Sequence, residues 1–185
     1  METLKSNLYV KNIVDDYKTG DICYDELYQR DVGQWTKEQN SLLIDSIIKR
    51  YSIPALWFER TIKFNYNVID GRQRINAIVT YINDGFKLDK DLDPVTFMDD
   101  NEDGDEVKIV EEIAGKKFSQ LSKELQHRIL KYPMDIILML DYSEDEKEEQ
   151  FYRLNNGSLF TKQQKATVDQ RLHSYRHQKP CRKLP

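Results

Sequence analysis

The segment from Val68 to Arg74, with the sequence VIDGRQR, constrains the fold of this chain more than any other. An apolar strand ending runs into a carboxylate and a glycine, and the arginines after it precede apolar residues at positions 75, 78, 79 and 82. Apolar residues at that spacing form one face of an amphipathic helix, and Gly85 is a typical C-terminal signal. The sequence therefore predicts a strand, a tight turn and a helix that begins near Arg72.

This turn is a candidate anion site. A helix N-terminus offers unpaired N–H groups and a partial positive charge, and both favour phosphate. Gly71 lets a ligand approach the backbone closely, and the planar fork of an arginine matches two phosphate oxygens. The alternative interpretation is an ordinary strand-to-helix turn that Asp70 caps, with both nearby arginines in solvent.

Hydrophobic periodicity predicts further helices and strands on both sides of the turn. The expected helices cover Val10–Thr19, Thr36–Tyr51, Ser122–Leu130 and Glu144–Leu154, and the expected strands cover residues 21–24, 55–58, 62–69, 95–97, 107–110 and 134–140. Thr36 and Gln39 fit a capping box at the start of the second helix. The residues expected to be buried are Trp35, Leu43, Ile47, Ile69, Ile75, Ile78, Val79 and Ile137.

The charge of the chain is acidic and unevenly distributed. Its 185 residues are expected to form one domain, or one domain with a short appendage. The net charge is −4, and leaving out the five basic residues after Asp169 gives −9 for the remainder. Because phosphate neutralisation dominates nucleic-acid affinity, this charge argues against an extended basic groove. Any contact with a nucleotide or a nucleic acid then requires a focused basic pocket.

Neither a membrane span nor a secretory signal is evident in the sequence. No stretch approaches the ~20 apolar residues that a spanning helix needs. Residues 1–12 also lack the apolar core of a signal peptide. We therefore expect a cytoplasmic protein without a membrane partner.

Signatures of several common chemistries are absent from the sequence. There is no Walker P-loop, no GxGxxG segment, no Cys-x-x-Cys zinc pattern and no nucleophile elbow, which disfavours P-loop or Rossmann nucleotide binding and acyl transfer. What remains is a set of arginines at the ends of predicted elements, namely Arg30, Arg72, Arg74 and Arg153. We expect these arginines to converge with Asp70 on one anion-sized pocket. The alternative is that each is an ordinary surface residue.

Five segments occur in an order that resembles a known family. They are Tyr28-Gln29-Arg30 followed by Trp35, Leu43 to Ile47 with Ile53-Pro54, Val68 to Arg74, Phe118 to Leu130, and Phe151 to Gly157. This order resembles the ParB-like N-terminal domain of GmrSD-type restriction proteins, a branch of the ParB/sulfiredoxin superfamily. The resemblance extends from about Val10 to Ala166.

The resemblance implies an α+β fold with a small mixed sheet and surrounding helices. It also implies that the domain binds and hydrolyses a nucleoside triphosphate with Mg²⁺, while a separate HNH-type domain cuts DNA. By position, Asp70, Gly71, Gln73 and Arg74 match the hydrolysis motif. Asp70, Gln73 and Arg74 are the expected catalytic residues, and Asp70 is the expected Mg²⁺ ligand or orients the attacking water. Arg30, Arg153 and Asn155 match flanking family positions that complete the pocket, and with Gly71 and Arg72 they are the expected nucleotide-binding residues.

The sequence departs from the family pattern in two respects. Arg72 stands where the family has glutamine, which adds positive charge to the turn. The resemblance fades after Ala166 and no HNH segment follows, so we expect one domain over residues 1–166 and a short basic tail over residues 167–185. The expected partners are then a nucleoside triphosphate and an HNH-type nuclease or DNA. A ParB-like DNA nuclease, a non-catalytic regulatory or interaction module, and a homo-oligomer stay open as alternatives.

Overall fold

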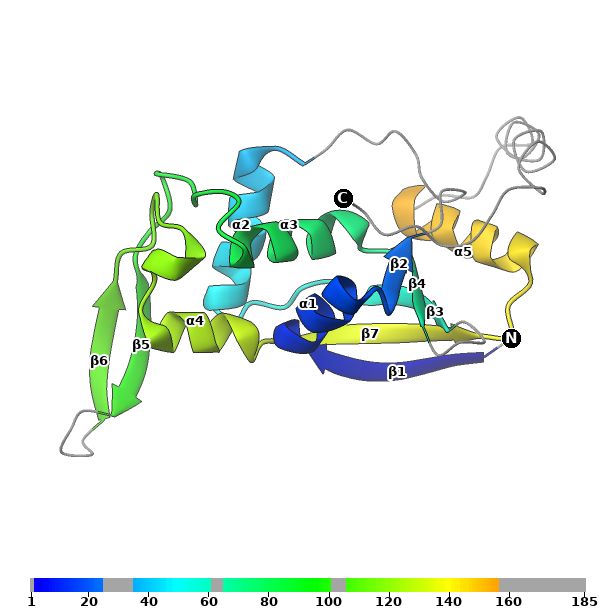
Figure 1. Ribbon diagram of the computed structural model, residues 1–185, viewed down its shortest axis with the longest axis horizontal. Helices are drawn as coiled ribbons and strands as arrows, with labels where there is room; N and C mark the ends of the chain where they lie inside the picture. The colour runs from blue at the N-terminus through cyan, green and yellow to red at the C-terminus, as the bar shows by residue number, and fades with distance from the viewer. Residues whose placement is uncertain (1, 25–34, 61–64, 101–105, 157–185) are drawn as a thin grey trace.

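A five-stranded mixed sheet forms the centre of the fold (Figure 1). The computed structural model describes residues 2–24, 35–60, 65–100 and 106–156. In chain order the strands are β1 (Glu2–Tyr9), β2 (Ile22–Tyr24), β3 (Leu56–Arg60), β4 (Tyr66–Asp70) and β7 (Pro133–Leu140). Their order across the sheet is β1-β7-β3-β4-β2. The β1–β7 and β3–β4 pairs are antiparallel, whereas the β7–β3 and β4–β2 pairs are parallel.

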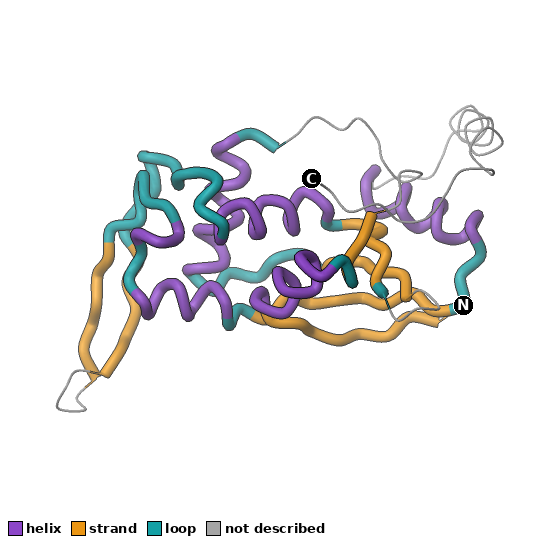
Figure 2. The backbone as a smooth tube through the Cα atoms, in the orientation of Figure 1, coloured by secondary structure: helices purple, strands orange, loops and turns teal. Residues whose placement is uncertain are grey.

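Helices account for most of the remaining regular structure (Figure 2). The described residues form α1 (Val10–Thr19), α2 (Lys37–Ile48), α3 (Arg72–Ile82), α4 (Lys123–Leu130), α5 (Glu144–Asn156) and a 3-10 turn over Phe118–Gln120. Helices and a mixed sheet in this arrangement confirm the expected α+β class. Across these residues, no helix combines the length and apolar character needed to cross a membrane.

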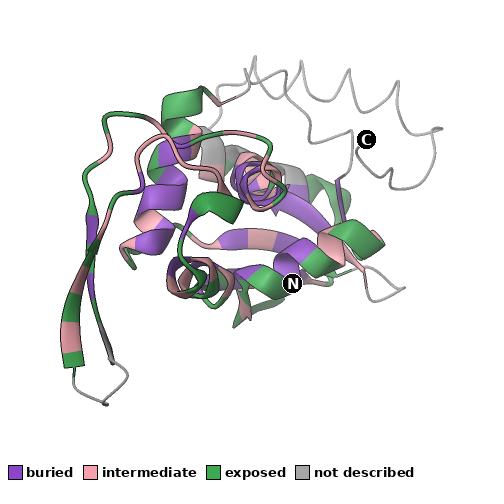
Figure 3. Cartoon of the chain, turned by 60° about the vertical axis from the view of Figure 1, so that its left-hand side comes forward, coloured by how far each residue is buried: buried purple, intermediate pink, exposed green. Residues whose placement is uncertain are grey.

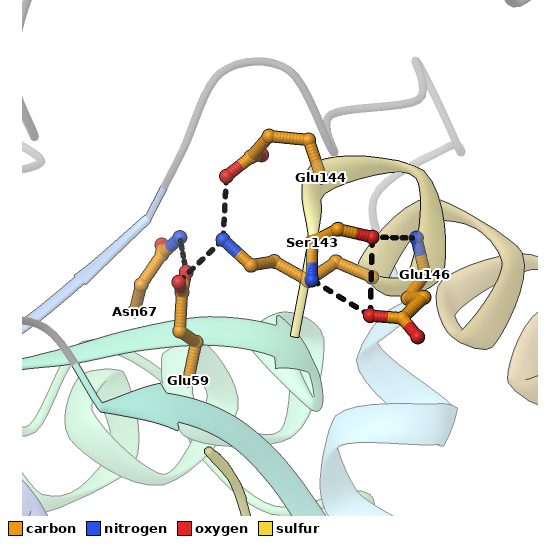
Figure 4. A network of polar contacts seen from close by, with 6 residues as sticks. Glu59, Asn67, Ser143, Glu144 and Glu146 are labelled. Carbon is orange, nitrogen blue, oxygen red and sulfur yellow. Dashed lines mark hydrogen bonds and ion pairs between the residues drawn. The ribbon is translucent and has the colours of Figure 1, made fainter. Parts of the chain in front are cut away.

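The two faces of the sheet are covered by different helices. Leu56, Phe58 and Val68 belong to one buried cluster with residues of α1, α2, α3 and α4, and buried residues concentrate between these helices and the sheet (Figure 3). Because successive side chains of a strand alternate, Glu59 and Asn67 point to the other face. There the side-chain amide of Asn67 donates to Glu59, and the carboxylate of Glu59 forms an ion pair with Lys147 of α5 (Figure 4). Helices α3 and α5 therefore lie on opposite faces.

A second, two-stranded sheet extends away from this body (Figure 1). Its strands β5 (Val95–Asp100) and β6 (Glu106–Glu111) pair antiparallel. Val95 and Phe97 are buried, whereas Met98 and Val110 are exposed. Both strands were expected from the sequence. Six acidic residues occur between Asp99 and Glu106, and the centre of this run, residues 101–105, lies outside the described residues.

Most of the secondary structure agrees with the sequence-based predictions. Helix α1 ends at Gly20 with φ of 84°, and α4 begins after Ser122, whose side chain accepts from the backbone N–H of Leu125. Six of the eight residues expected to be buried are buried. The other two, Trp35 and Ile137, are half-buried. Ile137 lies opposite Lys5 of the exposed edge strand β1, so its side chain is less fully covered by other residues.

Candidate functional site

The predicted turn lies at one edge of the sheet, where β4 passes into α3. Strands β2 and β4 run parallel, so their carboxyl ends meet at this edge, a common place for ligand sites in sheets with parallel strands. The pairing of β3 with β4 shifts by one residue between Trp57 and Phe58, so that Asp70 rather than Ile69 lies opposite Trp57. Bulges of this kind re-aim side chains beside binding sites.

Gly71 makes the turn possible. It is the N-cap of α3 and has φ of 107°, in the left-handed region that disfavours residues with a side chain. A Cβ atom at this position would overlap Cδ2 of Leu56. Both the backbone conformation and the space therefore require glycine. No side chain of the described residues caps the first turn of α3, so Asp70 does not act as its cap.

Arg74 is buried and its guanidinium is held on three sides. Nη2 pairs with Oδ2 of Asp70 at 2.5 Å, and Nη1 donates to the carbonyl oxygens of Pro54 and Ala55. Burial lowers the pKa of Arg74, and the neighbouring carboxylate of Asp70 acts in the opposite direction. These contacts join the start of α3 to the end of β4 and to the segment that leads into β3.

Arg72 and Gln73 are half-buried at the start of α3. The guanidinium carbon of Arg72 lies 5.1 Å from the ring centroid of Tyr24, at the end of β2. Tyr24 is buried, and Tyr17 of α1 meets its ring edge to face at 6.3 Å. Burial raises the pKa of Tyr24, with Tyr17 adding to the effect and Arg72 opposing it. Arg72 is therefore a cation positioned by an aromatic ring rather than by a carboxylate.

The structure brings only part of the predicted set together. Asp70, Gly71, Arg72, Gln73 and Arg74 gather at the turn. Arg153 lies on α5, where its side chain is exposed and Nε pairs with Glu149 at 3.0 Å. Helix α5 covers the face of the sheet opposite to α3. In the described part of the chain, no contact therefore joins Arg153 to Arg74. Arg30 lies outside the described residues, as does the side chain of Asn155.

The turn offers a single carboxylate to a metal ion. Oδ2 of Asp70 is occupied by Arg74, which leaves Oδ1 for a further contact. Over the described ranges, no group of three or more His, Cys, Asp or Glu side chains is placed to hold a metal. Mg²⁺ commonly binds through one or two carboxylates together with substrate phosphates and water. The residues present therefore fit Mg²⁺ carried by a bound nucleotide rather than an independent metal site.

Two contributions to this site are absent from the sequence-based prediction. One is Tyr24, which could have been found by noting that a short strand parallel to β4 places its last residue at the same sheet edge as Asp70. The other is the pair of carbonyl groups of Pro54 and Ala55, which no residue pattern marks as partners of Arg74.

Comparison with known protein families places the chain in a family. The model of the GmrSD restriction endonuclease N-terminal domain matches residues 10–166, which is most of the chain and includes the whole α3 turn. A comparison with curated proteins finds no match.

Proposed function

The chain belongs to the family of GmrSD restriction endonuclease N-terminal domains, and from that premise we propose that it binds nucleoside triphosphates at the N-terminus of α3. The observation that carries the proposal is the uncapped first turn of α3 with Arg72 beside it. Arg72 is held over Tyr24 and pairs with no carboxylate in the described part of the chain. Free backbone N–H groups and an unpaired arginine together favour a multiply charged anion.

In this proposal the residues of the turn have different roles. Arg72 and the first N–H groups of α3 contact phosphate oxygens. Arg74, whose donors reach Asp70 and two carbonyl groups, positions the turn. Asp70 has one oxygen left for Mg²⁺ on the phosphates or for a water molecule, and Gln73 orients the attacking water.

We further propose that the bound triphosphate is hydrolysed. Water attacks the γ-phosphorus, the bond to the β–γ bridging oxygen breaks, and the products are the nucleoside diphosphate and inorganic phosphate. This reaction depends mainly on positioning and charge neutralisation. The helix N-terminus and Arg72 supply both, and Mg²⁺ bound with the nucleotide adds charge neutralisation.

Family membership supports a regulatory place for this activity. The matched family is the N-terminal domain of a restriction endonuclease, so nucleotide binding here is proposed to control DNA cleavage by an HNH-type nuclease partner. DNA as the final target favours a cytoplasmic location.

A phosphate-release assay beside a plasmid-nicking assay tests this proposal. The purified chain is mixed with each of the four ribonucleoside triphosphates and Mg²⁺. Phosphate release without nicking supports the proposal, nicking without phosphate release indicates a DNA nuclease, and nucleotide binding without either indicates a regulatory module. Arg72→Gln should weaken binding, whereas Lys87→Gln, the same loss of charge at an exposed position after α3, should not.

A further inference from the structure

A second group of positively charged residues shares no residue with the α3 turn. It lies where the C-terminal ends of α2 and α4 meet the start of α1 (Figure 1). The backbone N–H of Val10 donates to the carbonyl oxygen of Tyr132 at 3.0 Å, which joins the start of α1 to the segment after α4. We call the side chains around this junction the α2–α4 patch. Four of them, Tyr9, Arg50, Tyr51 and Lys131, are exposed, and the fifth, Arg128, is half-buried.

The two arginines of the patch each bind the end of the other's helix. Nε of Arg128 donates to the carbonyl oxygen of Ile48 at 2.8 Å, at the end of α2. Nη1 of Arg50 donates to the carbonyl oxygen of Lys131 at 3.4 Å, just after α4. Helix C-termini leave carbonyl groups unpaired, so these contacts fix both guanidinium groups in place. Each guanidinium has five N–H donors, so several remain for a ligand.

Aromatic rings lie beside these cations. The guanidinium carbon of Arg50 is 5.8 Å from the ring centroid of Tyr132, and Nζ of Lys131 is 5.4 Å from that of Tyr9. The hydroxyl of Tyr132 donates to the carbonyl oxygen of Tyr51 at 2.6 Å, which fixes the backbone there. Tyr9 and Tyr51 are nevertheless 50% and 60% exposed. The patch therefore presents the exposed ring of Tyr9 beside Lys131, and the exposed side chain of Tyr51 directly after Arg50 in the chain.

The positive charge of the patch is not neutralised by ion pairs. Within the described ranges, none of Arg50, Arg128 and Lys131 has a carboxylate at ion-pair distance. Partial burial and then the charge of Arg128 lower the pKa of Arg50, while Tyr132 and Glu124 act in the opposite direction. Arg50 and Arg128 are thus close enough to repel each other, and a bound anion relieves that repulsion.

We propose that the α2–α4 patch binds a single-stranded segment of DNA. Its cations meet phosphate groups, and its exposed tyrosine rings accept unstacked bases, as in proteins that bind single strands without sequence preference. The acidic charge of the rest of the chain confines the contact to this focused patch. DNA is chosen over RNA because this inference rests on the proposed function, in which DNA is the final target.

A patch of this size binds weakly and with a marked salt dependence. Non-specific contacts with DNA have dissociation constants of roughly 10⁻⁴ to 10⁻⁶ M, and each contact between a cation and a single-strand phosphate contributes ~0.7 to the slope of log affinity against log salt. The three cations of the patch therefore give an expected slope of about −2.

Fluorescence anisotropy tests this proposal with the full chain and a dye-labelled oligo-dT. A length of ~12 nucleotides lies within the usual range of single-strand site sizes. Lys131→Gln should reduce the salt slope by ~0.7. Tyr51→Ser should weaken binding at least ~5-fold, the fold-change equivalent to ~1 kcal/mol for one stacked base. Neither side chain forms a hydrogen bond with the described residues, so both variants should fold, which circular dichroism checks.

Lys90→Gln is the matched control, because it removes one positive charge from an exposed position in the loop after α3. The proposal is overturned if the unmodified chain gives no anisotropy change at low salt, or if Lys90→Gln and Lys131→Gln reduce the slope equally. Duplex DNA or oligo-rU binding as tightly as oligo-dT would also overturn it, as would polyglutamate competing as well as DNA. Triphosphate binding at α3 should be unchanged in both patch variants, so the two proposals fail separately.

Discussion

Asp70 and Arg74 form an ion pair one helical turn apart, with Oδ2 of Asp70 2.5 Å from Nη2 of Arg74. The same guanidinium donates to the carbonyl oxygens of Pro54 and Ala55, in the segment before β3. Arg74 therefore adds polar contacts that join the start of α3 and the end of β4 to the segment before β3. This gives Arg74 a structural role in the turn and leaves the less constrained cation, Arg72, for the proposed ligand.

Replacing Arg74 should destabilise the fold. Arg74→Met leaves Asp70 and two carbonyl groups without their partner, and we expect the free energy of unfolding to fall by ~3 kcal/mol, the lower end of the range for a broken buried pair. The lower end applies because the side chain of Asp70 is 26% exposed. Urea denaturation measures the change. Arg72→Met is the control and should cost less than ~1 kcal/mol, since it loses only the contact with Tyr24. An unchanged midpoint for Arg74→Met would contradict this role.

Gly71→Ala should cost more stability than the same change at Gly115. Both glycines have positive φ, 107° and 69°, so an alanine at either position is strained by ~1–2 kcal/mol. At Gly71 the new Cβ also overlaps Leu56, whereas nothing lies within 4 Å of one at Gly115. Overlap in a packed core adds ~1–3 kcal/mol. Equal losses of unfolding free energy for the two variants in urea denaturation would show that β3 shifts to accommodate the new Cβ. Packing would then not require glycine at position 71.

Local signals explain which elements the sequence predicts well. The start of α2 is predicted from Thr36 and Gln39, and both capping-box hydrogen bonds are present, at 2.9 and 3.3 Å. Strand β1 has no such signal, because its residues are polar or exposed on both faces. It forms by pairing with β7, which lies far along the chain. Its existence therefore depends on tertiary context that periodicity does not contain.

The candidate site, like the fold, is predictable from the sequence only where local signals specify it. The Asp70–Gly71 turn is predictable, since a strand, a glycine and a helix in succession require it. The partners of Arg72 and Arg74 are not, because Tyr24, Pro54 and Ala55 reach the turn only through the packing of β2 and β3. The position of Arg153 depends on which face of the sheet α5 covers, and residue spacing does not specify that.

Glu111 should contribute stability that is lost in acid. Burial raises the pKa of its carboxyl, but hydrogen bonds from Ser122 and the contact with Lys116 outweigh burial, and the pKa lies below the ordinary value of 4.5. A carboxyl whose pKa is lowered by folding stabilises the protein above its unfolded pKa, and this contribution disappears as the pH falls through the folded value. The difference in unfolding free energy between the unmodified chain and Glu111→Gln should therefore shrink below pH 4.5.

Urea denaturation at a series of pH values from ~6 down to ~3 measures this difference across the window in which the carboxyl gains its proton. Glu112→Gln, at the exposed neighbouring position, is the matched control for the loss of one negative charge. A constant difference between the unmodified chain and Glu111→Gln over the whole series would contradict the assigned role of Ser122 and Lys116.

Arg72 should contribute to the affinity for triphosphate but not to the stability of the fold. Arg72→Gln removes one charge-assisted contact, worth ~1.5–3 kcal/mol, so isothermal titration with a nucleoside triphosphate should show binding ~10- to 100-fold weaker. Its urea midpoint should change little, in contrast to Arg74→Met. Asp70→Asn keeps an oxygen for Arg74 and should retain binding while phosphate release falls. If Arg72→Gln binds as tightly as the unmodified chain and Arg153→Gln does not, the pocket lies on the α5 side of the sheet and its assignment to the α3 turn is wrong.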